Sequence, residues 1–289
     1  MKLEIIYKKH LSLLTSIAYR MLGSLADAED IVQEVFLEVQ KLDTDHVYNM
    51  KAYLVKSVTN RCINFLKSAR KRREVYVGPW LPEPQITLSE QNPMELVVKD
   101  EAISYAFLVM LNQLNAVERA VFILREVLDY SYSEIAQALD KTEENCRKIY
   151  SRIKKKLHQD VPVPSSNMEK EDALVQSFIL ASKTGNFDNF ISMLTDDAIL
   201  TMDGGGKVRG ALRPIISRHR ILALFKGIVP RGYFEGNLLP VHINNQRGIL
   251  LMRNDQPTLV ICFGWDLQQE HIKRIFIISN PDKLKHIQV

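Results

Sequence analysis

Apolar residues recur at helical spacing through the first 75 positions of the chain. In "SLADAEDIVQEVFLEVQKL", Ile31, Val35 and Val39 share one stripe, which predicts a helix with a buried face. The stretch before it ends at Gly23, a typical helix stop, and the acidic residues after Gly23 suit the first turn of a new helix. A third helix is expected at "MKAYLVKSVTNRCINFLKSARKRR", with these positions facing the core: Tyr53, Leu54, Val58, Cys62, Phe65 and Leu66.

A second helical pattern, "DYSYSEIAQALDKTEENCRKIYSRIKKKL", has the spacing of a helix-turn-helix. It divides into a short helix at 132–139, a turn at 140–142 and a longer helix at 143–157. Thr142 is a natural N-cap for the longer helix. The apolar positions of that helix are expected to pack on Ile135, Ala136 and Leu139; they are Cys146, Ile149, Tyr150, Ile153 and Leu157.

The pattern changes after the proline- and serine-bearing stretch "DVPVPSSNMEKED". Two helices and a strand that runs into the glycine turn "DGGGK" are expected first, followed by a helix in "ALRPIISRHRILALFKGI". Four strand candidates come next, at "NLLPVHIN", "RGILLMRN", "TLVICFGWDL" and "HIKRIFIIS". Helices followed by strands predict an α+β domain with an antiparallel sheet.

Composition adds little to this pattern, but it excludes several classes of protein. The chain has 289 residues, 46% hydrophobic and 25% charged, which is ordinary for globular domains. Its start lacks the apolar run of a signal peptide, and no apolar segment is long enough to span a bilayer, so we expect a cytoplasmic protein without a membrane contact. The three cysteines have no metal-binding spacing, so neither a metal nor a cofactor is expected.

Positive charge gathers in two clusters, at 67–73 and at 147–156. Two such clusters suggest two separate contacts with a polyanion, although a basic helix face can also be merely solvated. Arginine and lysine contact guanine edges or phosphates, and asparagine suits adenine, so the outward face of the longer helix is able to read a major groove. Its candidate DNA contacts are Asn145, Arg147, Lys148, Ser151, Arg152 and Lys155; a helical hairpin with a solvated face is the alternative.

Taken together, these motifs resemble a known family. "RMLGSLADAEDIVQEVFLEV", "AYLVKSVTNRCINFLK" and "LNQLNAVERAVFILREVLDYSYSEIAQALDKTEENCRKIYSRIKKKL" resemble sigma domains two and four of a bacterial extracytoplasmic-function sigma factor, of the sigma-70 family, over residues 5–160. The order of elements after 168 resembles a SnoaL-like or NTF2-like cone. With "PWLPEP", "DGGGK" and "NPDKL", it resembles the subgroup that carries such a C-terminal extension. The resemblance implies a multidomain protein in which two all-α sigma domains precede an α+β cone.

The resemblance also divides the chain and assigns partners. Domain two at 1–75, a linker at 76–93, domain four at 94–160, a second linker at 161–168 and the cone at 169–289 are expected. In such factors the "DAEDIVQEVF" helix binds the beta-prime clamp helices of core RNA polymerase, which makes Asp30, Gln33 and Glu34 candidate contacts. The helix-turn-helix would read the minus-35 promoter element.

The minus-10 element would be opened and read by the third helix and the loop before it, around Asp45 to Met50. Asn64 stands where an aspartate is common in the family, and Ala116 stands where a proline often precedes "ER". The candidate minus-10 contacts are Asn60, Arg61, Asn64, Lys67 and Arg70.

In the resembled subgroup the extension acts on the sigma domains and replaces a separate anti-sigma factor. The prolines of "PWLPEP" restrict the backbone, so this segment can present its apolar side chains at a small ordering cost. We expect the segment to meet the cone near the glycine turn, although packing on a sigma domain is an alternative and the sign of regulation stays open. The interdomain candidates are Trp80, Leu81, Pro82, Glu83, Pro84, Asp203, Gly204, Gly205, Gly206 and Lys207.

Two other classes of function fit parts of the sequence. The first is a helix-turn-helix regulator that acts without core polymerase. The second is a ligand-sensing enzyme fused to a DNA-binding module, in which Asp203, His219, Trp265 and Asp266 would supply acid, base and stacking groups. No spacing links these four residues, so a protein without catalytic activity is expected.

Overall fold

The computed structural model describes residues 2–41, 47–73, 76–87, 103–157 and 167–287. They group into two compact units. The helical unit comprises residues 1–74, 94–101 and 110–159, and the cone unit comprises residues 75–93, 102–109 and 160–289, within the described ranges. The segment after residue 75 therefore belongs with the C-terminal fold. The five-part domain division stays a prediction.

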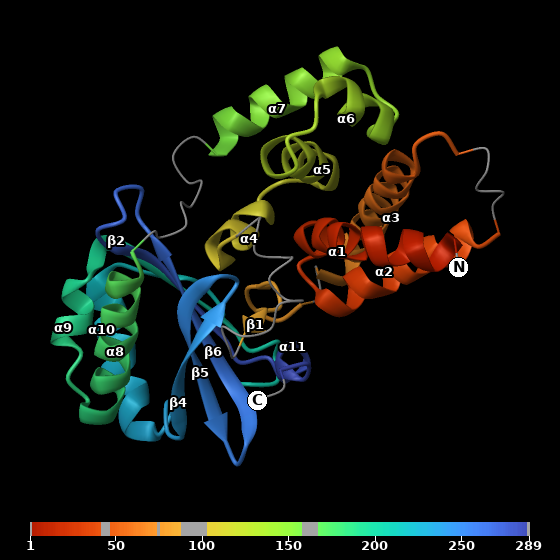
Figure 1. Ribbon diagram of the computed structural model, residues 1–289. Helices are drawn as coiled ribbons and strands as arrows, with labels where there is room; N and C mark the ends of the chain where they lie inside the picture. Colours follow the sequence, from red (N-terminus) through yellow and green to blue (C-terminus); the bar gives the residue numbers. More distant parts are fainter. Residues whose placement is uncertain (1, 42–46, 74–75, 88–102, 158–166, 288–289) are drawn as a thin grey trace. The chain divides into compact units, whose positions relative to one another are not determined.

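The helical unit begins with three packed helices, α1 (Lys2–Leu22), α2 (Leu25–Val39) and α3 (Met50–Arg73) (Figure 1). Gly23 adopts a left-handed φ of 71° after α1. Ser24 caps α2, because its hydroxyl accepts a hydrogen bond of 3.2 Å from the Asp27 amide. The expected stripe of α2 is buried at Ile31, Val35 and Val39. The amphipathic pattern thus predicted this helix and its inward face correctly.

The second half of the helical unit contains the expected helix-turn-helix. Its two helices are α6 (Tyr132–Leu139) and α7 (Glu143–Leu157), and Asp140 between them takes a left-handed φ of 51°. The Thr142 hydroxyl accepts a 3.2 Å hydrogen bond from the Asn145 amide, as expected of an N-cap. Two further helical segments of this unit precede the pair, α5 (Ala116–Phe122) and the π-helical turn η3 (Ile123–Val127). The helix before them, α4 (Tyr105–Leu111), begins in the cone unit.

The cone unit is built on a seven-stranded sheet in the order β1-β4-β5-β6-β7-β2-β3. The sheet is mixed, so the expectation of an antiparallel sheet was wrong: β2 pairs with β7 in parallel. The chain leaves β2 for α10 and the β4–β6 meander before β7 returns beside β2, and this long connection permits parallel pairing. The strands are β1 (Ile86–Thr87), β2 (Leu194–Asp203), β3 (Ile215–Ile216), β4 (Asn237–Ile243), β5 (Gln246–Arg253), β6 (Gln256–Trp265) and β7 (Ile272–Ile278).

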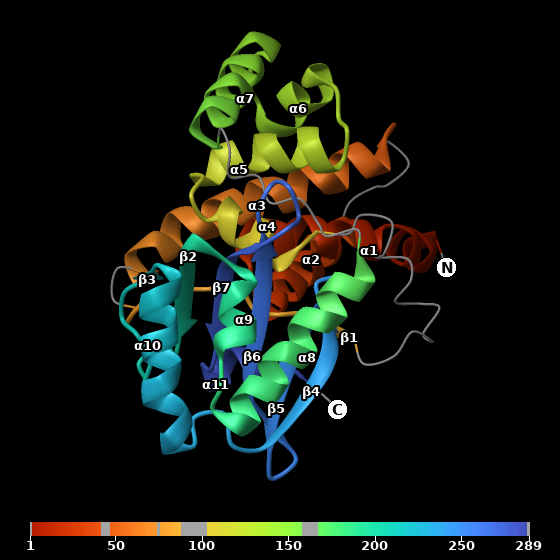
Figure 2. The ribbon, with the colours of Figure 1, turned by 90° about the vertical axis from the view of Figure 1, so that its left-hand side faces the viewer.

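Three helices cover one face of this sheet: α8 (Met168–Thr184), α9 (Asp188–Ser192) and α10 (Arg218–Ile228) (Figure 2). Between helices and sheet lies an aromatic core in which the Phe178 ring contacts five other phenylalanine rings, with centroids 5.1–6.4 Å apart. α10 begins later than the sequence pattern suggested, because residues 215–216 pair with β2 as β3. The 3₁₀ turn η4 (Val229–Arg231) follows α10.

The opposite face of the sheet is covered mainly by segments that lie before residue 110 in the chain. Leu81, Tyr105 and Ala106 are almost fully buried in the cluster that also contains Val260 and Phe276 of the sheet. The short helix α11 (Pro281–Leu284) completes this layer through Leu284. In the part of the chain that the structure describes, no helix combines the length and the apolar character needed to cross a membrane.

Candidate functional site

The outward face of α7 presents the side chains that the sequence assigned to DNA reading. All six candidates are exposed, from Asn145 to Lys155. The Arg147 guanidinium lies 4.5 Å from the centroid of the Tyr132 ring and 3.2 Å from the Glu143 carboxylate. This pair of contacts holds Arg147 in one orientation. Lys148 pairs with Glu144 at 2.6 Å, whereas Arg152 forms no ion pair with any described residue.

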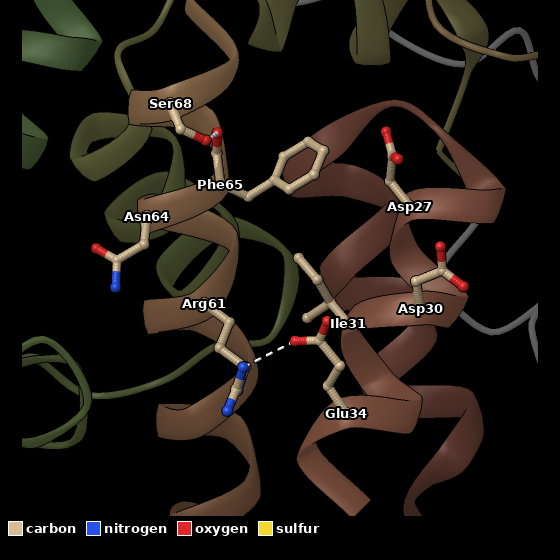
Figure 3. Close-up of a pocket in the computed structure, with 8 residues that line it drawn as sticks. All are labelled: Asp27, Asp30, Ile31, Glu34, Arg61, Asn64, Phe65 and Ser68. Carbon is tan, nitrogen blue, oxygen red and sulfur yellow. Dashed lines mark hydrogen bonds and ion pairs between the residues drawn. The ribbon is translucent and has the colours of Figure 1, made fainter.

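A groove lies between α2 and α3, with a volume of about 410 Å³ (Figure 3). Ile31 and Phe65 supply its apolar surface. One side of it is acidic and comes from α2, and the other comes from α3. The remaining residues that line it are Asp27, Asp30, Glu34, Arg61, Asn64 and Ser68.

Arg61 joins the two helices across this groove. Its guanidinium lies 2.8 Å from the Glu34 carboxylate (Figure 3) and also donates a hydrogen bond to Glu38, one turn further along α2. The hydrogen bond to Glu38 and the charges of the two carboxylates raise the pKa of Arg61 above its ordinary value. The sequence assigned Arg61 to DNA and Glu34 to polymerase, but the structure pairs these residues with each other.

The exposed face of α2 carries the three polymerase candidates, Asp30, Gln33 and Glu34. Leu37 lies on the same outward side, with 56% of its surface exposed, and sequence reasoning missed it. An apolar residue outside the buried stripe of an amphipathic helix is the signal that could have found it. The face therefore combines carboxylates with one large apolar side chain.

The side of α3 that the sequence assigned to promoter contacts partly packs against the helix-turn-helix. The Asn60 side-chain amide donates a 3.3 Å hydrogen bond to the carbonyl of Ala138 in α6, and the Lys56 ammonium lies 2.5 Å from Asp140. Asn64 and Lys67 stay exposed further along α3. The side chain of Arg70 and the loop positions 45–46 lie outside the described residues.

A buried arginine adds a second connection between the halves of the helical unit. Arg119 of α5 is 3% exposed and donates a 2.6 Å hydrogen bond to the carbonyl of Met21 at the end of α1. It also donates to the Asn112 side chain at 3.1 Å. The "ER" pair that includes Arg119 was visible in the sequence, but its partner 98 residues away was not. We call the contacts of Lys56, Asn60 and Arg119 the closed-state contacts.

In the cone unit, the Asp203 carboxylate collects four donors. It accepts hydrogen bonds from the Tyr76 hydroxyl at 2.6 Å, the Leu81 amide at 2.8 Å and the Gly205 amide at 3.0 Å. The Lys283 ammonium lies 2.6 Å from the same carboxylate, and both side chains are buried. The segment around "PWLPEP" therefore meets the glycine turn at a buried ion pair.

Lys283 also binds the "PWLPEP" segment directly. Its ammonium donates to the Leu81 carbonyl and lies 4.2 Å from the centroid of the Trp80 ring. The Asn280 amide donates to the Tyr76 hydroxyl at 2.8 Å, and burial, with the hydrogen bond to Asp203, raises the pKa of Tyr76 above its ordinary value. Sequence reasoning did not assign these roles to Tyr76, Asn280 or Lys283, although it quoted "NPDKL" as a motif.

The remaining interdomain candidates lie around this ion pair. The Pro82 carbonyl accepts a 2.7 Å hydrogen bond from the Tyr105 hydroxyl, and Pro84 has its carbonyl 3.1 Å from His286 Nε2. Lys207 pairs with Asp282 at 2.7 Å. Gly205 has a φ of 59°, and an added Cβ would lie 2.3 Å from the Asn280 side chain, so this turn needs glycine at that position. Pro82 and Pro84 are buried, and Trp80 and Glu83 are half-buried, as part of the same segment.

The residues considered for catalysis do not form one site. Asp203 is engaged in the buried ion pair, and His219 is exposed on α10. Asp266 accepts a hydrogen bond from the Glu270 amide, and its carboxylate lies 3.8 Å from His271. Trp265 is 8% exposed within the aromatic core. No group of three or more potential metal-ligating side chains occurs among the described residues.

Comparisons with known proteins identify the family and the fold. Residues 6–72 match the family model of sigma-70 region 2, and residues 104–157 match that of sigma-70, region 4. The chain is 32% identical over 240 residues to the extracytoplasmic-function (ECF) RNA polymerase sigma factor SigJ of Mycobacterium tuberculosis, covering 81% of this chain and 76% of that protein. It is 26% identical to SigG of the same species, covering 85% and 76% of the two chains. The crystal structure of SigJ superposes with a TM-score of 0.76 and 25% identity, covering 96% of this chain and 97% of the other.

Proposed function

This chain belongs to the family of extracytoplasmic-function RNA polymerase sigma factors, and we propose that its cone unit controls promoter use in cis. Factors of this family bind core RNA polymerase and direct it to promoters, and the two sigma-70 regions of this chain supply that activity. The added proposal is that the cone unit restrains the segment that joins the two regions. The observation that carries it is the buried Asp203–Lys283 pair, which holds Leu81 through its backbone amide and carbonyl.

Burial gives this attachment its strength. Leu81 is 1% exposed in the apolar cluster under the sheet, and removing such a side chain typically costs about 2–5 kcal/mol of stability. The Asp203–Lys283 pair has side chains only 0% and 7% exposed, and breaking a buried pair costs about 3–5 kcal/mol. Removing either Leu81 or one partner of the Asp203–Lys283 pair is therefore expected to lower stability by several kcal/mol.

Both described ends of the joining segment belong to the cone unit. Residues 76–87 lie against the sheet and add β1 to its edge. Tyr105 and Ala106, at the start of α4, belong to the same apolar cluster, on the sheet face opposite α8, α9 and α10. An added Cβ on Gly264 would lie 3.0 Å from the Ala106 side chain, so the glycine keeps β6 close to α4. Region 4 therefore starts from a helix whose first turn the cone unit holds.

We assign the partner surfaces from the exposed side chains of α2, α3 and α7. The exposed carboxylates of α2, with Leu37, are the proposed contact with the beta-prime clamp helices, and α7 is the proposed reader of the minus-35 element. The exposed end of α3 is the proposed minus-10 surface. Regulation in cis without a separate anti-sigma factor, a cytosolic location and the absence of a catalytic step belong to the same proposal.

The test compares variants of the full chain in transcription assays with purified core polymerase. Trp80→Ala and Lys283→Met remove parts of the attachment and are expected to change promoter-specific transcript output at least about threefold, with little change in core affinity. Trp80→Ala removes a half-buried ring and leaves the Asp203–Lys283 pair and the buried Leu81 side chain in the sequence. Lys273→Met, which removes an exposed ion pair with Asp197, is the matched control. Unchanged output from both test variants would overturn regulation through this attachment.

A further inference from the structure

The cone unit contains a basic stretch that neither the sigma regions nor the attachment of the linker explains. From Gly204 to Phe234 the sequence has no acidic residue, although acidic residues occur on both sides, at Asp203 and Glu235. Basic residues in the same stretch are Lys207, Arg209, Arg213, Arg218, Arg220, Lys226 and Arg231. Two of them are neutralised locally, because Lys207 pairs with Asp282 and Arg218 pairs with Asp196.

Three of the five remaining cations lie on α10 or just after it, and the other two, Arg209 and Arg213, precede the helix. Ile221 and Phe225 are fully buried and fix the inward side of the helix. Arg220, Lys226 and, just after the helix, Arg231 are exposed, and none of the three forms an ion pair with a described residue. We call these three residues, with the exposed His219, the α10 basic face.

The middle of the α10 basic face carries only small residues. Helical geometry places Ala223 and Gly227 between Arg220 on one flank and Lys226 on the other. Nothing lies within 4 Å of a Cβ built on Gly227, so the glycine is not required by packing inside the chain. A glycine inside a helix costs about 1 kcal/mol relative to alanine. The face therefore has small residues at its centre and cations at its edges.

We propose that the α10 basic face binds the phosphate backbone of duplex DNA in the promoter complex. Arg220 and Lys226 are six positions apart within α10, about 9 Å along the helix axis, which matches the axial rise of about two to three nucleotides in one strand. Guanidinium groups suit phosphates through paired hydrogen bonds, and the small central residues let a backbone come close. Promoter DNA is the polyanion that a sigma factor binds. The α10 basic face would therefore add a sequence-independent contact to the proposed contacts of α3 and α7.

The test measures holoenzyme binding to promoter DNA as a function of salt concentration. For Arg220→Gln with Lys226→Gln, we expect the slope of log Kobs against log [salt] to become shallower by about two, at about 0.9 per lost phosphate contact. Affinity at 0.1 M salt should fall roughly tenfold or more. A duplex without promoter elements should show the same change in slope, because phosphates carry no sequence information.

The matched control removes two positive charges elsewhere on the cone unit. Lys183 at the end of α8 and Lys285 after α11 are both exposed, and Lys183→Gln with Lys285→Gln should leave the slope unchanged. Arg220→Lys with Arg231→Lys should retain most of the slope, since lysine preserves the charge. An unchanged slope in the test pair, or an equal change in the control pair, would overturn the proposal.

Two further outcomes would assign the face to another partner and would also overturn it. In one, the test pair weakens core polymerase binding and leaves the salt dependence of DNA binding intact, which indicates a protein surface. In the other, the test pair abolishes binding of the full chain to vesicles that contain anionic lipid, with DNA binding intact. Core-dependent transcription at low salt should persist in the test pair, so failure of this inference is distinguishable from failure of the sigma-factor activity.

Discussion

The two helices that the sequence assigned to promoter DNA, α7 and α3, have similar polar chemistry but different surroundings. On α7, Asn145, Ser151, Arg152 and Lys155 are exposed, and none of them is engaged by another helix in the described structure. On α3, by contrast, Asn60 binds the Ala138 carbonyl. Two further polar residues of α3 are also engaged: Lys56 is bound to Asp140, and Arg61 is bound to Glu34 and Glu38.

On the roles proposed above, we expect this difference to separate two steps of promoter use. A duplex element could be read by α7 with its side chains as they stand, because groove contacts need only the exposed face of one helix. Contacts through Asn60 would require its hydrogen bond to the Ala138 carbonyl to break. We therefore expect the proposed minus-35 surface to be available before the proposed minus-10 surface, which would be completed only when α6 leaves α3.

The largest expected effect comes from removing the open cations of α7. Arg152→Gln with Lys155→Gln should weaken holoenzyme binding to promoter DNA on the order of 10- to 100-fold at 0.1 M salt, because two phosphate contacts are lost. The matched control in the same helix is Lys154→Gln with Lys156→Gln, whose ammonium groups already pair with Glu126 and Glu118. Filter binding across a salt series measures both. Equal losses of DNA affinity for the two pairs of substitutions would show that cations without an ion pair and cations already paired with glutamate contribute alike.

A smaller effect should follow from loosening the closed-state contacts. Asp140→Asn removes the charge that holds Lys56 but keeps a residue that tolerates the left-handed backbone, since Asp140 has a φ of 51°. Binding of a single-stranded minus-10 oligonucleotide to the free chain should rise about two- to fivefold, the range for losing an exposed ion pair. Fluorescence anisotropy with a labelled oligonucleotide measures the change.

Asp129→Asn is the control for this substitution. Asp129 also has a left-handed φ, of 52°, and lies 3.7 Å from Arg125, but it forms no ion pair with a described residue of α3. Its replacement should leave oligonucleotide binding unchanged. A rise in both variants would show that negative charge, and not the contact with α3, limits binding.

The smallest effect is expected at Arg61, where the two assigned surfaces overlap. Arg61→Gln should weaken core polymerase binding up to about fivefold, because Glu34 and Glu38 lose the cation that orients them. The salt slope of promoter binding should stay the same, since Arg61 is engaged by α2. Titration of core polymerase with labelled protein measures the first quantity. A slope that becomes shallower by about one, with core affinity intact, would return Arg61 to the DNA surface.

Local patterns in the sequence predicted much of the architecture. The apolar stripe of α2, the N-cap at Thr142 and the four strands from β4 to β7 depend on neighbours within a few positions, so their spacing was sufficient. The contact between the "PWLPEP" segment and the glycine turn was also expected. That expectation came from the family resemblance and from the proline-restricted backbone of the segment. The structure confirms the contact, because the Leu81 amide donates a hydrogen bond to the Asp203 carboxylate.

Interactions between distant segments were not readable in the same way. The parallel pairing of β2 with β7 depends on the path of the chain between them, and β1 is a two-residue strand that exists only because β4 offers an edge. No local pattern indicates that Lys283 pairs with Asp203, which lies 80 positions earlier in the chain. The hydrogen bond from Arg119 to the backbone carbonyl of Met21 could not be predicted either. Every residue has a carbonyl, so the residue type at position 21 does not mark it as an acceptor.

The most direct test of the closed state joins α3 to α6 covalently. Lys56→Cys and Asp140→Cys place thiols at two positions that an ion pair joins in the native chain, and a reducible thiol cross-linker long enough to span the lost lysine side chain can connect them. Because Asp140 has a left-handed φ of 51°, the uncross-linked double variant must first show unchanged promoter binding. The three native cysteines are buried and are expected to react slowly, because burial raises the pKa of the Cys62, Cys146 and Cys262 thiols. With the cross-link in place, holoenzyme should still bind a minus-35 duplex but should fail to open promoter DNA, and reduction should restore opening. Full promoter opening by the cross-linked protein would contradict the account.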